Sequence, residues 1–149
     1  MKIYIDADAC PKEAKDVLFK ASKRLNIEII LVANCYVRTP PDTNIKVIVV
    51  ARGTDVADDK IVELVQAGDL VITSDIPLAS RVVKKSAFAL SSHGEFFDDK
   101  NIGSRLAIRN LLEELRTDGI QSSGPAPYSA KNKADFANAL NRFIVKKEP

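Results

Sequence analysis

The sequence has few of the residues that build disulfide frameworks and zinc sites. It holds two cysteines, Cys10 and Cys35, and one histidine, His93. The cysteines form no C-x-x-C pair, and a single histidine cannot build a histidine metal site. We therefore expect neither a disulfide-stapled secreted domain nor a structural zinc domain, and we expect both cysteines to pack as small hydrophobic side chains.

Several phosphate-binding and phosphate-cleaving motifs are also missing. The sequence contains no Walker A loop and no G-x-G-x-x-G loop. It lacks the C-x5-R loop of cysteine phosphatases, because the residue six positions after Cys10 is Asp16. These absences exclude the common nucleotide-binding loops and a cysteine-based phosphatase.

Neither a strong net charge nor a long apolar run marks the chain. The formal charge is +2, from 22 Lys and Arg against 20 Asp and Glu. That value excludes a histone-like polycation but not a nucleic-acid enzyme with local basic patches. The apolar stretch at residues 3–5 is too short to be a signal peptide, so we expect a cytoplasmic protein without a membrane span. The length of 149 residues and the 46% hydrophobic content predict one globular domain over residues 1–149.

Short apolar runs alternate with amphipathic stretches along the chain. The runs that predict strands are residues 3–5, 27–33, 47–50, 70–73 and 88–90. The stretches with a 3.6-residue period that predict helices are residues 11–25, 57–65, 77–83, 102–116 and 130–145. This order predicts an α/β fold, a three-layer α/β/α sandwich around a mainly parallel sheet.

Two connections do not follow the helical pattern. The segment at residues 34–44 contains Pro40-Pro41 and has no apolar period. The third strand is therefore expected at an edge of the sheet or after an irregular crossover. The Ser/Gly/Pro-rich stretch at residues 121–128 is expected to link the last two helices.

Carboxylates recur where the predicted strands end. Ligands bind at the carboxyl ends of the strands in an open parallel sheet. The acids at or just after these ends are Asp6, Asp8, Asp58, Asp59, Asp75, Asp98 and Asp99. Gathering carboxylates costs repulsion and desolvation, which a hard divalent cation offsets. The pattern predicts a Mg²⁺ or Mn²⁺ site and the hydrolysis of phosphate esters or diesters.

Most of these acids also have a purely structural explanation. Asp58 and Asp59 lie in the first turn of a predicted helix, where acids complement the helix dipole. Asp75 and Asp8 each precede a helix and could cap it. Asp6 is the exception, because a carboxylate at the end of a buried strand has no structural need to be there.

The basic residues concentrate toward the carboxyl terminus. After Ser104 the chain has 8 bases and 5 acids, against 14 bases and 15 acids up to that point. Arg105 and Arg109 share one face of the fourth predicted helix, and Lys131 and Lys133 stand at the start of the fifth. We expect these four residues to bind RNA phosphates; a solvated helix face is the alternative.

Five blocks of sequence resemble those of a bacterial family. They are IDADACP at residues 5–11, ADDKIV at 57–62, TSDIPLA at 73–79, NI at 101–102 and GPAP at 124–127. In this order they resemble the YaiI/YqxD family of uncharacterised proteins over essentially the whole chain.

The same blocks are remotely similar to the PIN-like nucleases, especially the NYN branch of metal-dependent ribonucleases. That resemblance implies a PIN-like (Rossmannoid) sheet. It also implies a Mg²⁺ or Mn²⁺ site held by Asp6, by Asp58 or Asp59, and by Asp75, with Asp8 beside the first. We expect a ribonuclease that hydrolyses single-stranded RNA, with Asp6, Asp59 and Asp75 as catalytic residues.

Two alternative functions remain open at this point. The first is a haloacid-dehalogenase-type phosphomonoesterase, because the chain contains residues like its motifs in the same order. These are Asp6-x-Asp8, Thr73-Ser74, Lys84 or Lys85, and Asp98-Asp99. In that enzyme class Asp6 would be the nucleophile. The other alternative is a PIN-like module that binds RNA or a protein without cleaving, for which RNA binding should survive the substitution Asp6→Asn.

Overall fold

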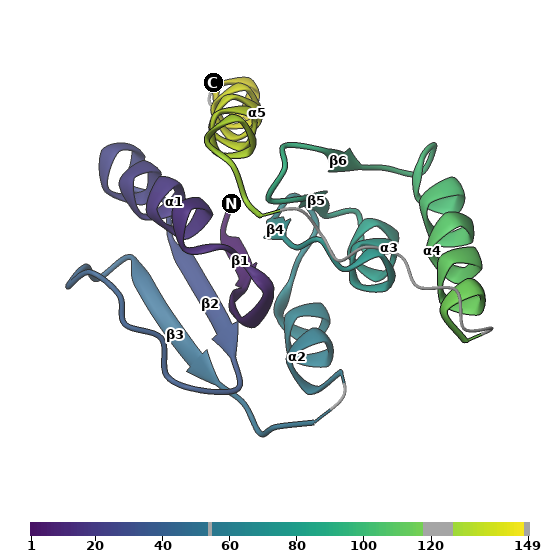
Figure 1. Cartoon of the computed structure of the whole chain (residues 1–149). Helices are drawn as coiled ribbons and strands as arrows, with labels where there is room; N and C mark the ends of the chain where they lie inside the picture. The colour runs from purple at the N-terminus through teal and green to yellow at the C-terminus, as the bar shows by residue number, and fades with distance from the viewer. Residues whose placement is uncertain (54, 118–126, 148–149) are drawn as a thin grey trace.

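The computed structural model describes residues 1–53, 55–117 and 127–147, and Figure 1 shows it as an α/β fold. Its elements in chain order are β1 (Ile3–Asp6), η1 (Ala7–Ala9), α1 (Lys12–Leu25), β2 (Ile29–Ala33), β3 (Ile45–Val49), α2 (Val56–Leu64), β4 (Leu70–Ile72), α3 (Ile76–Lys84), β5 (Phe88–Leu90), β6 (Phe96–Phe97), α4 (Ile102–Thr117) and α5 (Ala130–Lys147). The predicted fold class is confirmed. Most of the predicted link at 121–128, and the block at 124–127 except Pro127, lie outside the described residues.

The sheet has the strand order β3-β2-β1-β4-β5-β6. Strands β1 to β5 run parallel, and β6 is antiparallel to β5. The chain builds outward from β1 to β3 and then returns to β4 on the other side of β1. The boundary between β1 and β4 is therefore the switch point of the topology, where open α/β sheets bind ligands beyond the carboxyl ends of the strands.

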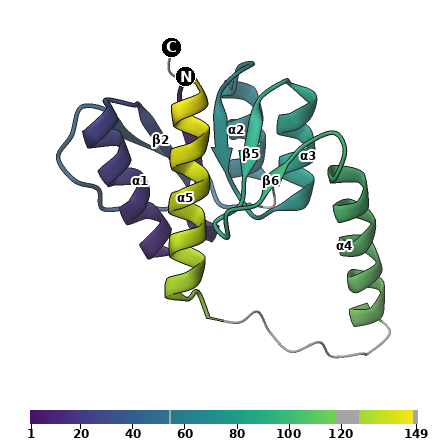
Figure 2. The same cartoon turned by 90° about the horizontal axis from the view of Figure 1, so that it is seen from above.

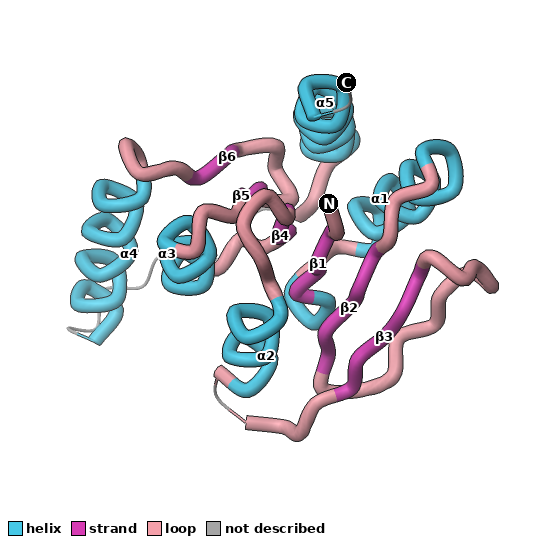
Figure 3. The backbone as a smooth tube through the Cα atoms, turned by 180° about the vertical axis from the view of Figure 1, so that it is seen from behind, coloured by secondary structure: helices cyan, strands magenta, loops and turns pink. Residues whose placement is uncertain are grey.

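Helices cover both faces of the sheet, which gives the three layers (Figures 1 and 3). Alternate residues of a strand point to opposite faces. Ile5 therefore packs with α1 and α5, whereas the neighbouring Tyr4 packs with α2 and α3. Strands β1, β2 and β4 are buried along their whole length, as their near-continuous apolar sequences predict.

Strand β3 lies at one edge of the sheet and pairs in parallel with β2, from Ile29 opposite Ile45 to Ala33 opposite Val49. The connection between the two strands, residues 34–44, contains no helix. Both parts of the expectation for this strand, the edge position and the irregular crossover, are therefore confirmed.

Strand β6 was not predicted, and it changes the path of the chain. It pairs with β5 through Ala89 opposite Phe97 and Leu90 opposite Phe96. Because β6 is antiparallel, the residues after Phe97 come back toward the start of β5, at the amino edge of the sheet. Asp98 and Asp99 thus lie at the edge opposite to the one that their place after the fifth strand predicts.

The turn between β5 and β6 holds the start of α5 in place. Gly94 has φ +88°, and a Cβ atom built on it would lie 2.7 Å from the backbone oxygen of Asp135 in α5. The Tyr128 hydroxyl donates a 2.7 Å hydrogen bond to the backbone oxygen of Ser92 in the same turn. Figure 2 shows α5 beside α1, and Phe143 of α5 contacts the rings of Phe88 and Phe96. Among the described residues, no helix is both long and apolar enough to span a membrane.

Candidate active site

Three carboxylates from three elements face the switch point between β1 and β4. Asp6 is the last residue of β1, Asp75 follows β4 as the N-cap of α3, and Asp58 lies in the first turn of α2. These elements are adjacent because β1 and β4 pair and α2 packs on β1. The prediction that Asp6 and Asp75 lie at the carboxyl ends of their strands is therefore confirmed.

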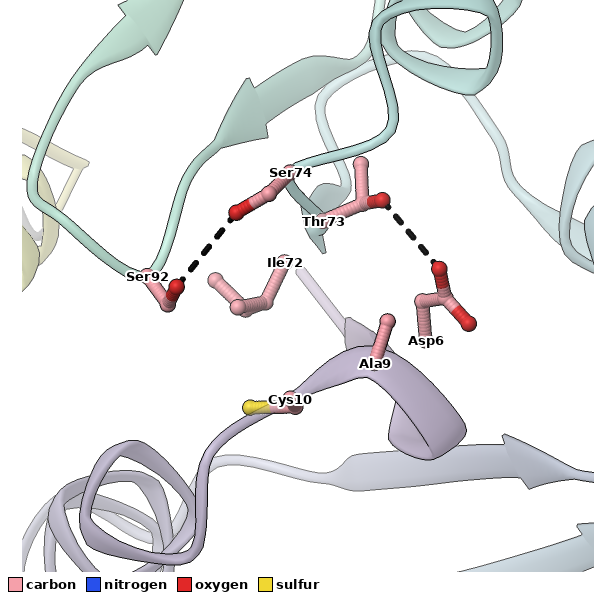
Figure 4. Close-up of a pocket in the computed structure, with 7 residues that line it drawn as sticks. All are labelled: Asp6, Ala9, Cys10, Ile72, Thr73, Ser74 and Ser92. Atoms are coloured by element: carbon pink, nitrogen blue, oxygen red, sulfur yellow. Dashed lines mark hydrogen bonds between the residues drawn. The ribbon is translucent and has the colours of Figure 1, made fainter. Parts of the chain in front are cut away.

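Thr73 joins two of these acids. Its Oγ1 donates a 3.3 Å hydrogen bond to Oδ2 of Asp6 and accepts a 3.0 Å bond from the backbone N–H of Asp75. Asp75 Oδ1 in turn accepts a 3.0 Å bond from the Leu78 N–H, so Asp75 caps α3. Figure 4 shows the Thr73 side chain directed at Asp6. The capping alternative for Asp75 is therefore correct, and the cap fixes the carboxylate at the site.

Burial dominates the electrostatics of Asp6. Its side chain belongs to the buried part of the molecule, with only 8% of the residue exposed. Burial raises the pKa of Asp6, the hydrogen bond from Thr73 lowers it, and the negative charges of Asp75 and Asp8 raise it further. Keeping Asp6 charged therefore costs free energy in the protein alone, and a cation would offset that cost.

Asp58 belongs to the same electrostatic cluster. Partial burial raises the pKa of Asp58 to about 6, and the negative charges of Asp75, Asp6 and Asp55 add to this effect. The positive charge of Arg81 acts in the opposite direction. We call Asp6, Asp58 and Asp75 the acidic cluster.

Asp59 pairs with a cation and is not among the charges that act on Asp6 or Asp58. Its side chain is 65% exposed, and its Oδ1 accepts a 2.8 Å hydrogen bond from Nη1 of Arg81. The two neighbouring acids of the ADDKIV block are thus distinct: Asp58 joins Asp6 and Asp75, whereas Asp59 holds Arg81. Ile61 supplies the sequence signal for this difference, because it is the buried residue of α2 and Asp58, three positions earlier, lies on the same face of the helix.

Asp8 has a structural partner. It is exposed, and its Oδ2 accepts a 2.9 Å hydrogen bond from the backbone N–H of Asn34, just after β2. The N-cap of α1 is Pro11, and its side chain makes no capping bond, so Asp8 does not cap this helix. Asp8 ties the end of β2 to η1 and adds negative charge near Asp6.

Carboxylate oxygens are the donors that Mg²⁺ prefers, but the three acids of the acidic cluster do not converge on one position. Within residues 1–53, 55–117 and 127–147, no three Asp, Glu, His or Cys side chains lie close enough to hold one metal ion together. Mg²⁺ usually keeps several of its waters and takes only one or two carboxylates from the protein. The expected site in which Asp6, Asp58 or Asp59, and Asp75 hold one ion together is therefore not formed among the described residues, and one or two of these acids are what the cluster could offer to a hydrated ion.

A narrow recess opens beside Asp6. Its lining residues are Asp6, Ala9, Cys10, Ile72, Thr73, Ser74 and Ser92 (Figure 4). The hydroxyl oxygens of Ser74 and Ser92 lie 3.3 Å apart, which brings the end of β5 to the same edge. Ser74 was predicted only as part of the Thr73-Ser74 motif of the phosphatase alternative, and Ser92 was not predicted. Both serines follow strands, so both lie where ligands bind in an open parallel sheet.

The Cys10 thiol beside this recess is protonated rather than a reactive thiolate. Burial raises the pKa of the Cys10 thiol to about 12, with a smaller opposing effect from Lys15. Cys10 is therefore a thiol at neutral pH, and it packs against the core as predicted. The same prediction is wrong for Cys35, which is exposed in the connection after β2.

The four residues predicted to bind phosphates lie on two separate helices. Arg105 pairs with Glu95, Arg109 with Glu113, and Lys131 with Asp135, while Lys133 is half-buried. Helix α4, which carries the two arginines, lies on the far side of α3 from the sheet (Figures 1 and 3). Among the described residues, the cation whose charge acts on Asp58 is instead Arg81, which no sequence motif singles out.

The structure separates the residues of the phosphatase motif. Asp98 accepts hydrogen bonds from the N–H groups of Lys100 and Asn101 in the turn before α4, at the amino edge. Lys84 and Lys85 end α3, and the Lys85 ammonium donates to the backbone oxygen of Val62. These groups are at the opposite edge from Asp6, so their placement does not support the phosphomonoesterase alternative.

Comparison with known sequences identifies the family. The profile of the family described as Uncharacterized BCR, YaiI/YqxD family matches residues 4–146. The chain belongs to the YaiI/YqxD family. A UPF0178 protein of Burkholderia lata is 51% identical over 146 residues, which cover 98% of this chain and 97% of the relative. UPF0178 proteins of Burkholderia ambifaria and Shewanella pealeana are 50% and 49% identical over the same shares of each chain.

No solved structure matches this YaiI/YqxD protein, so its likeness to PIN-like nucleases stays a prediction from the sequence blocks. The structure shows where those blocks lie in the fold. The blocks at 5–11, 57–62 and 73–79 contribute Asp6, Asp58 and Asp75, and they meet at one edge of the sheet.

Proposed function

We propose that this YaiI/YqxD protein is a cytoplasmic ribonuclease that uses Mg²⁺ or Mn²⁺ to hydrolyse phosphodiesters of single-stranded RNA. The observation that carries the proposal is the acidic cluster at the switch point of the sheet. The charges of Asp6 and Asp75 raise the pKa of Asp58, and burial raises the pKa of both Asp6 and Asp58. A fold tolerates such a cluster when a bound cation offsets the repulsion.

Each acid of the cluster has its own role in this proposal. Asp6 presents a carboxylate whose Oδ2 is oriented by Thr73. Leu78 bonds Oδ1 of Asp75, so we assign its Oδ2 to the ligand side. Asp58 brings the third charge from α2. A bound Mg²⁺ or Mn²⁺ would lower the pKa of a coordinated water and stabilise charge on the phosphoryl oxygens.

The basic residues would position the RNA. Arg81 is held beside the acidic cluster by Asp59, so its charge is placed to attract a phosphate next to the scissile bond. Arg105, Arg109, Lys131 and Lys133 would follow the backbone farther away, and the first three would exchange an acidic partner for a phosphate. The resemblance to NYN ribonucleases supports RNA rather than DNA as the substrate.

The test is cleavage of a labelled single-stranded RNA in Mn²⁺ and in Mg²⁺, with EDTA as the negative control. Asp6→Asn and Asp75→Asn should each lose on the order of 100-fold or more in rate, because several kcal/mol of transition-state stabilisation depend on the metal. Equal residual activity in the wild type and both variants would indicate a contaminating nuclease and overturn the proposal.

Two further arms separate the alternatives. Hydrolysis of p-nitrophenyl phosphate without cleavage of RNA would favour the phosphomonoesterase. RNA binding that persists in Asp6→Asn, with no turnover of any substrate by the wild type, would favour a module that binds without cleaving.

A further inference from the structure

The turn between β5 and β6 carries an exposed histidine. This turn, residues 91–95, follows the carboxyl end of β5, which runs parallel to β4 and β1 and so ends at the same edge of the sheet as Asp6. Ser91 and Ser92 are each 5% exposed, whereas His93, which follows them, is exposed. The fold therefore buries the start of the turn and holds its one ring side chain in solvent.

Backbone contacts fix the position of this histidine. Ser91 Oγ accepts 3.2 Å hydrogen bonds from the N–H groups of His93 and Glu95, and the Ser91 N–H donates to the Glu95 backbone oxygen at 2.8 Å. On the other side of the turn, Gly94 lies so close to the backbone of Asp135 in α5 that a Cβ atom has no room there. A group that is already held in place loses little conformational freedom on binding, so the turn is suited to hold a ligand.

The His93 ring meets a second aromatic ring, from the chain just before α5. The ring centroids of His93 and Tyr128 lie 5.7 Å apart, and the two ring planes are inclined by 70°. The Tyr128 hydroxyl bonds the Ser92 backbone oxygen, so this ring is fixed to the same turn. A flat ring that stacks on one of two nearly perpendicular rings presents its edge to the other, and both are favoured aromatic contacts. We call His93 and Tyr128 the aromatic corner.

The aromatic corner lies beside the recess of the candidate site. Ser92 lines that recess together with Asp6, and its hydroxyl oxygen is 3.3 Å from that of Ser74 (Figure 4). Strand β5 is two positions from β1 in the sheet, so their ends are about 10 Å apart at ~4.8 Å per strand. Lys131 and Lys133 follow in the first turn of α5. A nucleotide strand with its scissile phosphate at Asp6 would therefore pass the aromatic corner with a neighbouring nucleotide and then reach these lysines.

We propose that the aromatic corner binds an unpaired base of single-stranded RNA, next to the nucleotide that is cleaved. Proteins hold unpaired RNA bases by stacking them on Phe, Tyr, Trp or His rings, while cations along the groove follow the phosphates. Every base has a π-face, so the corner adds affinity without requiring a fixed sequence. The inference rests on the proposed function for its substrate, and it adds a pair of residues that bind the RNA without taking part in its hydrolysis.

The first test measures binding without cleavage. A fluorescein-labelled single-stranded oligoadenosine RNA is titrated in EDTA and followed by fluorescence anisotropy. His93→Ala and His93→Leu should each weaken binding about tenfold, the loss of one stacked base, whereas His93→Phe keeps a ring and should keep wild-type affinity. Tyr36→Ala is the matched control, because it removes a 75% exposed ring from the chain after β2 and should change nothing. No binding by the wild type, or equal affinities of the wild type and His93→Leu, overturns the proposal.

The second test detects the stacked base directly. His93 is the only histidine in the sequence, so its imidazole C–H signals can be identified in a proton NMR spectrum of the full chain. Adenine rings stacked on the imidazole should move these signals upfield, and an abasic oligonucleotide with the same number of phosphates should not. Equal shifts with the two oligonucleotides would indicate a phosphate contact in place of stacking and would overturn the proposal.

Kinetics separate this inference from the proposed function. Stacking on a neighbouring base is the same in the ground state and in the transition state, so His93→Ala should raise KM for RNA cleavage in Mn²⁺ about tenfold and leave kcat unchanged. An unchanged KM in an active enzyme overturns the aromatic corner but not the ribonuclease. RNA binding that depends on His93, in a protein that cleaves no RNA, supports the aromatic corner and overturns the proposed function instead.

Discussion

Replacing Asp58 by asparagine should stabilise the metal-free protein, because Asp58 is held charged beside two other carboxylates. Its pKa is raised from 3.8 to about 6. A shift of two units corresponds to about 3 kcal/mol at 1.36 kcal/mol per unit. Asp58 is partly exposed, so solvent screening reduces the gain to ~1 kcal/mol. For a chain of this length, that gain raises the melting temperature by about 2–4 °C.

The gain should depend on pH in one direction. Between the unfolded pKa of 3.8 and the folded pKa of about 6, the folded protein binds more protons at Asp58 than the unfolded chain does. The stability of the wild type therefore falls through this window as pH rises. The advantage of Asp58→Asn should be absent below about pH 4 and complete above about pH 6.

The assay is thermal unfolding in EDTA at a series of pH values. Asp59→Asn is the matched control, because it removes the same charge from the next position of the same helix. It should show no gain, since Asp59 is exposed and pairs with Arg81. A melting temperature for Asp58→Asn equal to that of the wild type at pH 8, or a gain that is already present at pH 4, would refute the reasoning.

Three other predictions follow from particular contacts. Mg²⁺ at ten times its Kd should stabilise the wild type by about 1.4 kcal/mol but leave Asp6→Asn unchanged, as measured by thermal shift; an equal shift in both proteins would contradict the assigned site. Gly94→Ala should cost about 1–3 kcal/mol in urea unfolding, because its Cβ would meet Asp135 at positive φ, whereas Gly103→Ala, whose Cβ meets no neighbour, should cost nothing. A disulfide exchange reagent at pH 8 should titrate Cys35 rapidly and Cys10 only after unfolding, and two fast thiols would contradict the burial of Cys10.

The sequence predicts the parts of the fold that depend on local patterns. Apolar β-branched runs mark β1, β2 and β4 because buried parallel strands need apolar side chains on both faces. The two-residue strand β6 is too short to show any period, and missing it misplaces Asp98 and Asp99 at the wrong edge of the sheet. Whether the chain returns as a short antiparallel strand depends on its pairing with β5. No local sequence pattern contains that pairing.

The candidate site could be predicted from the sequence about as far as the fold could. The end of a buried strand identifies Asp6, and the helix start at Ile76-Pro77 identifies Asp75, the residue before it. The choice between Asp58 and Asp59 depends on the rotation of α2, which is set by the packing of Ile61 against the sheet. Adjacent residues on a helix point about 100° apart, so this packing turns one acid inward and leaves the other in solvent.

The central claim is that the acidic cluster, and not the neighbouring exposed acid, carries out the hydrolysis of RNA. The most direct measurement is single-turnover cleavage of a labelled single-stranded RNA in Mn²⁺ by the wild type, Asp58→Asn and Asp59→Asn. The account predicts that Asp58→Asn loses on the order of 100-fold or more in rate, whereas Asp59→Asn keeps most of the activity. No metal-dependent cleavage by the wild type, or equal rates for the two variants, would contradict it.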